Sequence, residues 1–235
     1  MKTIVIIHNL NSRGKNINED YVRELLNKKG IKFHYFQTKQ ISDVDEIIKK
    51  YNNPSQFQYC SIGGDGSLNA LVNSLMKNNI TMPEVSCLPG GSGSDFIRTF
   101  ALPQNIEDAV EHLIYDNFYE VDVGLINNKT DAKYFINVLN IGFLASTVEV
   151  SEKFPNLFRA FRYPLSFWIK IITARAKEMT ISNDKYEFKG MAFNICVCNA
   201  QYFGGGWNIS PKSSLQDGLF NICLLYTSDA ADEVD

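Results

Sequence analysis

Two glycine-rich turns hold the side chains and main-chain amides best suited to chemistry in this chain of 235 residues. The first spans Ser61 to Asn69 (SIGGDGSLN), where an apolar run from Phe57 meets three glycines and then apolar residues at helical spacing. A turn at a helix N-terminus presents unpaired amides and the positive end of the helix dipole, which favour an anion such as phosphate. Asp65 adds a carboxylate, which suits a metal ion or a polarised hydroxyl better than a bare phosphate. An ordinary strand-to-helix turn is the alternative that spacing alone leaves open.

A second turn, Pro89 to Phe96 (PGGSGSDF), follows the next predicted strand, Glu84 to Leu88. Ligands of an open parallel sheet bind beyond the carboxyl ends of its strands, so both turns are expected at one crevice. The polar loop from Asn9 to Asn16 follows the first predicted strand, Thr3 to Ile7, and belongs at the same edge. Its amides and basic side chains suit phosphate, although an ordinary loop between strand and helix has the same composition.

The repeated order of strand, loop and helix predicts a doubly wound α/β domain with a mainly parallel sheet. Ile17 to Leu26 has the spacing of an amphipathic helix, and Asn105 is a predicted N-cap of the last helix in this part. Ser42 and Asp45 resemble a capping box for another helix. We therefore expect the first domain at residues 1–117.

After Asn117 the pattern changes to that of a mainly antiparallel β-sandwich domain, expected at residues 118–225. Two hairpins and two further strands are predicted. They are Phe118 to Ile126 with Lys133 to Ile141, Met179 to Ile181 with Tyr186 to Phe188, Gly190 to Asn199, and Leu219 to Leu225.

The net charge and the cysteine content indicate which kinds of binding partner and which cellular compartment to expect. A net charge of -3 argues against a nucleic-acid partner. Five cysteines without metal-type spacing fit a reducing, intracellular setting. The sequence shows neither a signal peptide nor an apolar stretch long enough to be a transmembrane segment, so we expect a cytoplasmic protein. Nothing in the sequence indicates the oligomeric state.

The stretch from Lys153 to Lys177 combines six basic residues with six aromatic ones and contains no acidic residue. Such a composition favours contact with anionic lipid, which would place the protein peripherally at the inner membrane face. A core-packed pair of helices with a solvated basic rim is the alternative.

Five blocks of sequence, in order, resemble the bacterial diacylglycerol kinase and lipid kinase family, whose catalytic domain is shared with eukaryotic diacylglycerol, sphingosine and ceramide kinases. The first turn is similar to the family motif Gly-Gly-Asp-Gly-Thr, with Ser67 in place of Thr, and the second is similar to Pro-Leu-Gly-Thr-Gly-Asn-Asp-Phe. The other blocks are Phe135 to Val138 with Ile141 to Phe143, Asn199 to Gly206, and Pro211 to Phe220.

The resemblance implies transfer of the ATP γ-phosphoryl group to a lipid hydroxyl at the membrane surface, with diacylglycerol as the expected acceptor. It implies a magnesium ion, Mg²⁺, held by the Asp217 carboxylate and the main-chain carbonyls of Ser214 and Leu219, with Asp95 supporting the phosphates or the metal. The implied ATP-binding positions are Asn9, Thr38, Gly63, Gly64, Asp65, Gly66, Ser67, Leu68, Asn69 and Ser92.

The chain departs from the family pattern at Leu10 (usually Pro), Ala70 (usually Glu) and Ser94 (usually Asn). The family also has an Asp-Gly-Glu segment with the catalytic acidic residue, and this sequence has none. Residues 226–235 resemble a translated sequencing adapter, so we expect a non-native tail. Together these features predict a second domain incomplete at the C-terminus and an inactive fragment without its catalytic base.

Two other functions are weighed against the lipid kinase. An NAD kinase shares the Gly-Gly-Asp-Gly turn, but the blocks at Asn199 to Gly206 and Pro211 to Phe220 favour the lipid kinases. A non-catalytic module that binds nucleotide or lipid is suggested by Ala70 and the missing base.

Overall fold

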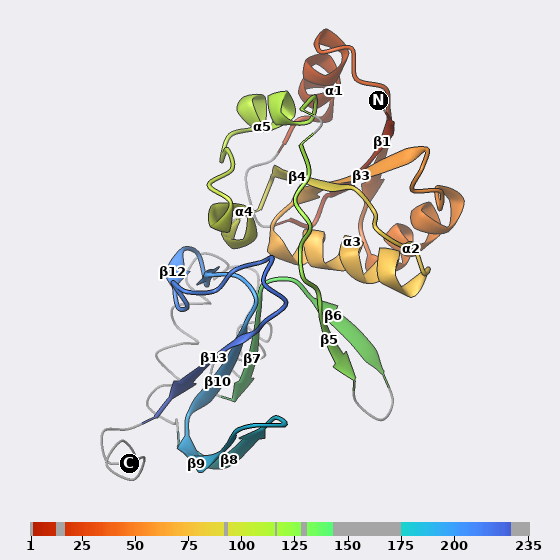
Figure 1. Cartoon of the computed structure of the whole chain (residues 1–235). Coiled ribbons are helices and arrows are strands. Elements are labelled where there is room, and N and C mark those ends of the chain that lie inside the picture. The colour runs from red at the N-terminus through yellow and green to blue at the C-terminus, as the bar shows by residue number, and fades with distance from the viewer. Residues whose placement is uncertain are drawn as a thin grey trace. The chain divides into compact units, whose positions relative to one another are not determined.

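A computed structural model describes residues 2–12, 17–91, 94–115, 117–127, 131–142 and 175–226 (Figure 1). The chain forms two compact units, of which the first comprises Met1–Asn137 with Asn199–Leu219. The second comprises Val138–Cys198 with Phe220–Asp235. The domain boundary expected between residues 117 and 118 stays a prediction.

The first unit contains a four-stranded parallel sheet in the order β2-β1-β3-β4. Its strands are β1 (Thr3–Asn9), β2 (Phe33–Thr38), β3 (Phe57–Gly63) and β4 (Val85–Pro89). The central strands β1 and β3 are buried on both faces, as their continuous apolar runs require. The predicted parallel α/β domain is confirmed.

Helices cover both faces of this sheet (Figure 1). They are α1 (Glu19–Lys28), α2 (Ile41–Lys50), α3 (Asp65–Lys77), α4 (Asp95–Thr99) and α5 (Ile106–His112). On one face, Ile4 and Ile6 of β1 pack with residues of α1 and α5. On the other, Val5 and Ile7 pack with residues of α2 and α3. Successive side chains of β1 point to opposite faces of the sheet, so this one strand contributes to both hydrophobic cores.

Helix capping confirms one prediction and corrects another. The Asn105 side chain accepts a hydrogen bond from the Asp108 N–H at 2.9 Å, as predicted for the start of α5. The predicted capping box at Ser42 and Asp45 is wrong, because α2 begins earlier and the Asp43 carboxylate accepts from the Lys39 and Gln40 N–H groups at 2.8 and 3.1 Å. Asp45 instead pairs with Lys77 of α3 at 3.1 Å.

The first β-hairpin is shorter than predicted. Strands β5 (Gly124–Asn127) and β6 (Ala132–Phe135) pair antiparallel in the first unit. The prediction of a single strand from Lys133 to Ile141 is wrong, because the pairing of β6 with β5 stops at Phe135, before Asn137. The Asn137 carbonyl accepts from the N–H groups of Asn199 and Ala200 at 3.0 and 3.2 Å instead.

The second unit contains the antiparallel sheet β13-β10-β7, built from β7 (Val138–Gly142), β10 (Asn194–Cys198) and β13 (Asn221–Leu225). Strands β8 (Lys177–Ser182) and β9 (Glu187–Ala192) confirm the predicted second hairpin. Two short strands, β11 (Tyr202–Phe203) and β12 (Trp207–Asn208), pair within the first unit.

No helix among the described residues is both long enough and apolar enough to cross a bilayer. Most of the basic and aromatic stretch, residues 153–174, and most of the predicted tail, residues 227–235, lie outside the described residues.

Candidate functional site

The first glycine-rich turn lies directly between β3 and α3. Strand β3 ends at Gly63 and α3 begins at Asp65, with Gly64 as its N-cap. The carbonyl of Gly64 accepts from the N–H groups of Ser67 and Leu68 at 3.0 and 3.1 Å, which closes the first helical turn. The N-terminus of a thirteen-residue helix therefore follows the carboxyl end of a buried parallel strand, the arrangement that favours phosphate.

The second turn touches the first through main-chain atoms. The Gly90 N–H donates to the Gly63 carbonyl at 3.0 Å. A Cβ at Gly91 would collide with the main chain of Gly64, and a Cβ at Gly90 would lie 3.2 Å from the Gly63 nitrogen and 2.7 Å from Ile17 Cδ1. Glycine is required here by close approach of two backbones.

Asp65 joins the two turns through its side chain. Its carboxylate accepts from the Asp95 N–H at 3.0 Å and from the Phe96 N–H at 2.9 Å, and so caps α4. Ser94, the residue before that helix, makes no side-chain cap of its own. Local spacing gave no sign of this role, because the bonds span 30 and 31 residues.

Asp95 is a buried carboxylate whose two oxygens have different partners. Only 3% of the residue is exposed, and Oδ2 accepts from the Gly205 N–H at 2.8 Å. Oδ1 is buried without a hydrogen bond and lies 3.8 Å from Arg98 Nε. Burial raises the pKa of Asp95 and the charge of Asp65 adds to the increase, while the Gly205 N–H opposes it. This buried carboxylate is thus held by one main-chain N–H and one ion pair rather than left without partners.

Asn9 and Thr38 are paired in register at the carboxyl ends of β1 and β2, and Asn9 also binds Ser67 of α3. The Asn9 amide donates to Ser67 Oγ at 2.9 Å, and Thr38 Oγ1 donates to the His8 carbonyl at 3.3 Å. The Leu10 N–H donates to the Thr38 carbonyl at 3.0 Å.

The other predicted nucleotide positions differ in their environments. The Leu68 side chain is buried, and the Asn69 carbonyl accepts from the Asn73 amide at 2.8 Å. A Cβ at Gly66 would meet no atom within 4 Å, so this position faces open space. Ser92 lies outside the described residues.

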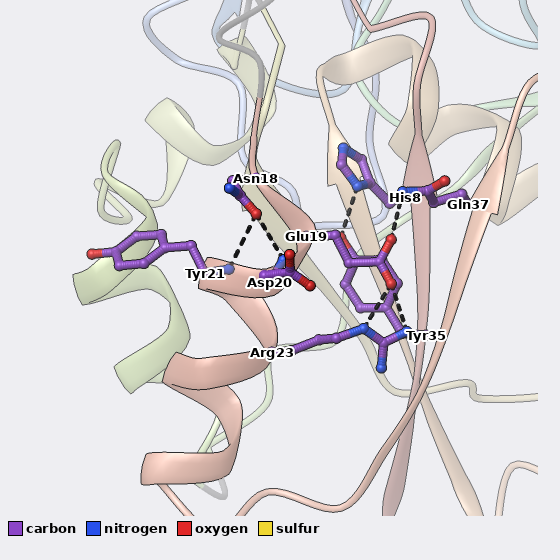
Figure 2. Close-up of polar contacts among 8 residues, drawn as sticks. All are labelled: His8, Asn18, Glu19, Asp20, Tyr21, Arg23, Tyr35 and Gln37. Atoms are coloured by element: carbon purple, nitrogen blue, oxygen red, sulfur yellow. Dashed lines mark hydrogen bonds and ion pairs between the residues drawn. The ribbon is translucent and has the colours of Figure 1, made fainter.

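A polar cluster lies beneath this edge, between β1, β2 and α1 (Figure 2). The Tyr35 hydroxyl lies 2.7 Å from His8 Nδ1, while Glu19 accepts from Arg23 Nε at 2.6 Å and from Gln37 Nε2 at 2.5 Å. Burial lowers the pKa of His8, and the Glu19 carboxylate acts in the opposite direction. Neutral His8 therefore holds the strand that leads into Asn9, which is a structural role.

The predicted metal-binding residues share one turn of the first unit. Asp217 Oδ1 accepts from the Leu219 N–H at 3.0 Å, and the Gly218 N–H donates to Asp122 Oδ2 at 2.7 Å. Within the described part of the chain, no group of three or more His, Cys, Asp or Glu side chains could hold a metal ion. The predicted set of one exposed carboxylate and two main-chain carbonyls does not need such a group, and its oxygen atoms suit Mg²⁺.

Residues 3–126 match the family described as "Diacylglycerol kinase catalytic domain". The chain belongs to this family. Residues 137–232 match a second family, described as "YegS C-terminal NAD kinase beta sandwich-like domain". The predicted C-terminal truncation is therefore not borne out, because the chain contains this second domain. The absence of the catalytic base stays a prediction.

Curated relatives of this diacylglycerol kinase family member are named as lipid kinases. "Probable lipid kinase YegS" of Escherichia fergusonii is 26% identical over 221 residues, which cover 92% of this chain and 73% of the relative. "Probable lipid kinase YegS-like" of Klebsiella pneumoniae is 27% identical over 213 residues, covering 89% and 70%.

A solved structure shows the same fold. The crystal structure of a diacylglycerol kinase from Bacillus anthracis has a TM-score of 0.73 and 20% identity, and the match covers 99% of this chain and 76% of that one. The α/β domain followed by antiparallel β-sheets is thus the two-domain fold of the family.

Asp65→Asn tests the link between the two turns. An amide supplies one acceptor where the carboxylate supplied two, so we expect a loss of about 1.5–3 kcal/mol in the free energy of unfolding. Urea unfolding of the variant measures it. Asp184→Asn, at an exposed turn of the second unit, is the control and should unfold like the wild type. Equal stabilities of the Asp65 variant and the wild type would contradict the link.

His8 predicts a pH dependence of stability. In the unfolded chain this imidazole has the ordinary pKa of 6.5, whereas burial lowers its pKa in the folded protein. Below pH 6.5 the unfolded state therefore binds a proton that the folded state does not, and the free energy of unfolding falls as the pH falls. His8→Gln keeps an acceptor for Tyr35 and should flatten this dependence. The exposed His34→Gln should not, and a flattening by both variants to the same extent would refute the assignment.

Proposed function

We propose that the protein is an ATP- and Mg²⁺-dependent lipid kinase that converts diacylglycerol to phosphatidic acid. The observation that carries the proposal is the direct main-chain contact between two glycine-rich turns at the carboxyl edge of a parallel sheet, held by Asp65. Family membership and the names of the curated relatives support a lipid acceptor.

The ATP side is assigned to the joined turns. Main-chain amides from Gly64 to Gly66, at the N-terminus of α3, would face the phosphates, where amides and dipole stabilise negative charge. Asn9 and Ser67 present polar groups beside these amides, and Thr38 fixes the end of β2 next to them. From the sequence, Ser92 adds a hydroxyl from the second turn.

The metal side is assigned to the turn that contains Asp217. Its carboxylate and the carbonyls of Ser214 and Leu219 would hold Mg²⁺, and Asp95 would support the phosphates or the metal. When bound, the ion neutralises charge on the phosphates and on the group in transfer.

The chain's own contribution to transfer is positioning. The lipid hydroxyl oxygen forms a bond to the γ-phosphorus, the bond from that phosphorus to the bridging oxygen of ADP breaks, and the hydroxyl proton leaves to a base. Holding the phosphates rigidly between two turns makes this displacement effectively unimolecular, which lowers its barrier. We assign the base to no residue.

The setting follows from the substrate. Diacylglycerol resides in a bilayer, so the protein would act as a cytoplasmic enzyme that binds the inner membrane face peripherally. The basic and aromatic composition of residues 153–177 supports binding to anionic lipid.

A vesicle assay tests the function. The protein is mixed with γ-labelled ATP, MgCl₂ and vesicles of phosphatidylglycerol that contain diacylglycerol. The lipid kinase proposal expects labelled phosphatidic acid, lost on Asp217→Ala, and such a product would overturn the predicted absence of the catalytic base. Label in NAD rather than lipid would favour an NAD kinase. ATP binding and vesicle binding without any labelled product would favour a non-catalytic module.

Gly91→Ala should separate the two turns, because its Cβ collides with the main chain of Gly64. We expect the Kd for ATP, measured by calorimetry, to rise at least about tenfold, roughly the loss of one charge-assisted hydrogen bond. Gly66→Ala separates the two possible causes, because its methyl group meets open space and leaves the fold unaffected, so any loss of ATP affinity there reports contact with the nucleotide rather than separation of the turns. Wild-type affinity in Gly91→Ala would show that the contact between the turns is irrelevant to ATP.

A further inference from the structure

The block from Asn199 to Gly206, which we call the strap, has no role in the binding described above. Its first residue is fully buried. The two N–H groups of the Asn199 side-chain amide donate to the carbonyls of Asp122 and Ile136 at 2.7 and 2.9 Å. Its main-chain N–H donates to the Asn137 carbonyl at 3.0 Å. One buried asparagine therefore fixes the main chain of both ends of the segment from Asp122 to Asn137.

Asp122, which Asn199 holds in place, also binds the turn that contains Asp217. While its carbonyl is held by Asn199, its N–H donates to the Leu215 carbonyl at 2.7 Å. Its carboxylate accepts from the Gly218 N–H, also at 2.7 Å. Gly218 has a φ of +68°, in the left-handed region, so the turn has a defined shape at the point that Asp122 binds.

The strap is also held at its glycine end. The Gly205 N–H donates to Asp95 Oδ2 at 2.8 Å, and Gly205 and its neighbours Gly204 and Gly206 all have positive φ. One short segment thus connects the turn with Asp217, through Asn199 and Asp122, to the carboxylate beside the second glycine-rich turn.

We infer that Asn199 is a positioning residue for the divalent cation. By fixing the main chain at Asp122, it sets the shape of the turn from Ser214 to Leu219, whose one carboxylate and two carbonyls would hold the ion. A buried amide suits this purpose because its two donors satisfy two buried carbonyls that would otherwise lack partners. The inference rests on the metal assignment of the proposed function.

Magnesium binding without nucleotide tests the role. Full-length chain is titrated with MgCl₂ alone, and the Kd is obtained by calorimetry and from the increase in melting temperature. Asn199→Ala should raise the Kd about 10- to 100-fold, the usual effect of losing a group that orients a ligand. Asn194→Ala, which removes another fully buried asparagine but in the second unit, should keep the wild-type Kd even if it lowers stability.

If Asn199→Ala fails to fold, Asp122→Ala tests the same inference. It retains the main-chain carbonyl that Asn199 binds and removes only the carboxylate that holds Gly218, so it should raise the Kd similarly. A wild-type Kd in either foldable variant, or an equal rise in Asn194→Ala, would overturn the inference while the function stands. Unchanged Mg²⁺ binding by Asp217→Ala would overturn the metal assignment itself, and the inference with it.

Discussion

The Asp65 carboxylate, bound to the main-chain N–H groups of Asp95 and Phe96, is the interaction on which the candidate site depends. Besides this carboxylate, the hydrogen bond from the Gly90 N–H to the Gly63 carbonyl joins the two turns, and each turn is rich in glycine and has few side chains of its own. The carboxylate replaces the missing cap of α4 and holds that helix against the start of α3. A charged acceptor bound to two amides is stronger than a neutral one, so the site is kept rigid before any ligand binds.

A second constraint follows from the position of Asp95. Because its N–H is used by Asp65 and one of its carboxylate oxygens by Gly205, its remaining oxygen has a fixed direction. Burial raises the pKa of Asp95 and the nearby charge of Asp65 adds to the increase, while the Gly205 N–H and the Arg98 guanidinium oppose it. The site therefore keeps two acidic side chains close together, Asp65 bound by two main-chain N–H groups and Asp95 bound by Gly205 and Arg98.

The sequence predicted those parts of the fold whose signal is local. Continuous apolar runs marked β1 and β3, the glycines marked both turns, and Asn105 was correctly expected as a cap. Hairpin β8–β9 was also found from its turn. The cap of α2 was placed too late, because Ser42 is a good capping residue by type, whereas the helix begins at Ile41 with Gln40 as its N-cap and Asp43 bound back to Gln40.

Hydrogen bonds between residues far apart in the chain could not be predicted from the local sequence. The strand expected to continue through Asn137 stops there because that residue's carbonyl binds a segment more than sixty positions away. Asp65 was predicted to face a ligand, yet both its oxygens bind α4. Asn199 and Asp122 are 77 residues apart, so only the folded chain shows that they act together. The nucleotide and metal positions themselves, Ser92 included, remain predictions.

Hydrogen exchange of the backbone amides, with and without ATP and MgCl₂, tests most directly whether the two turns form one nucleotide site. The structure predicts slower exchange in both Gly63–Leu68 and Ser94–Phe96 at the same ATP concentration, with the two effects lost together in Asp65→Ala. Protection of one turn alone, or of neither, would contradict a shared site.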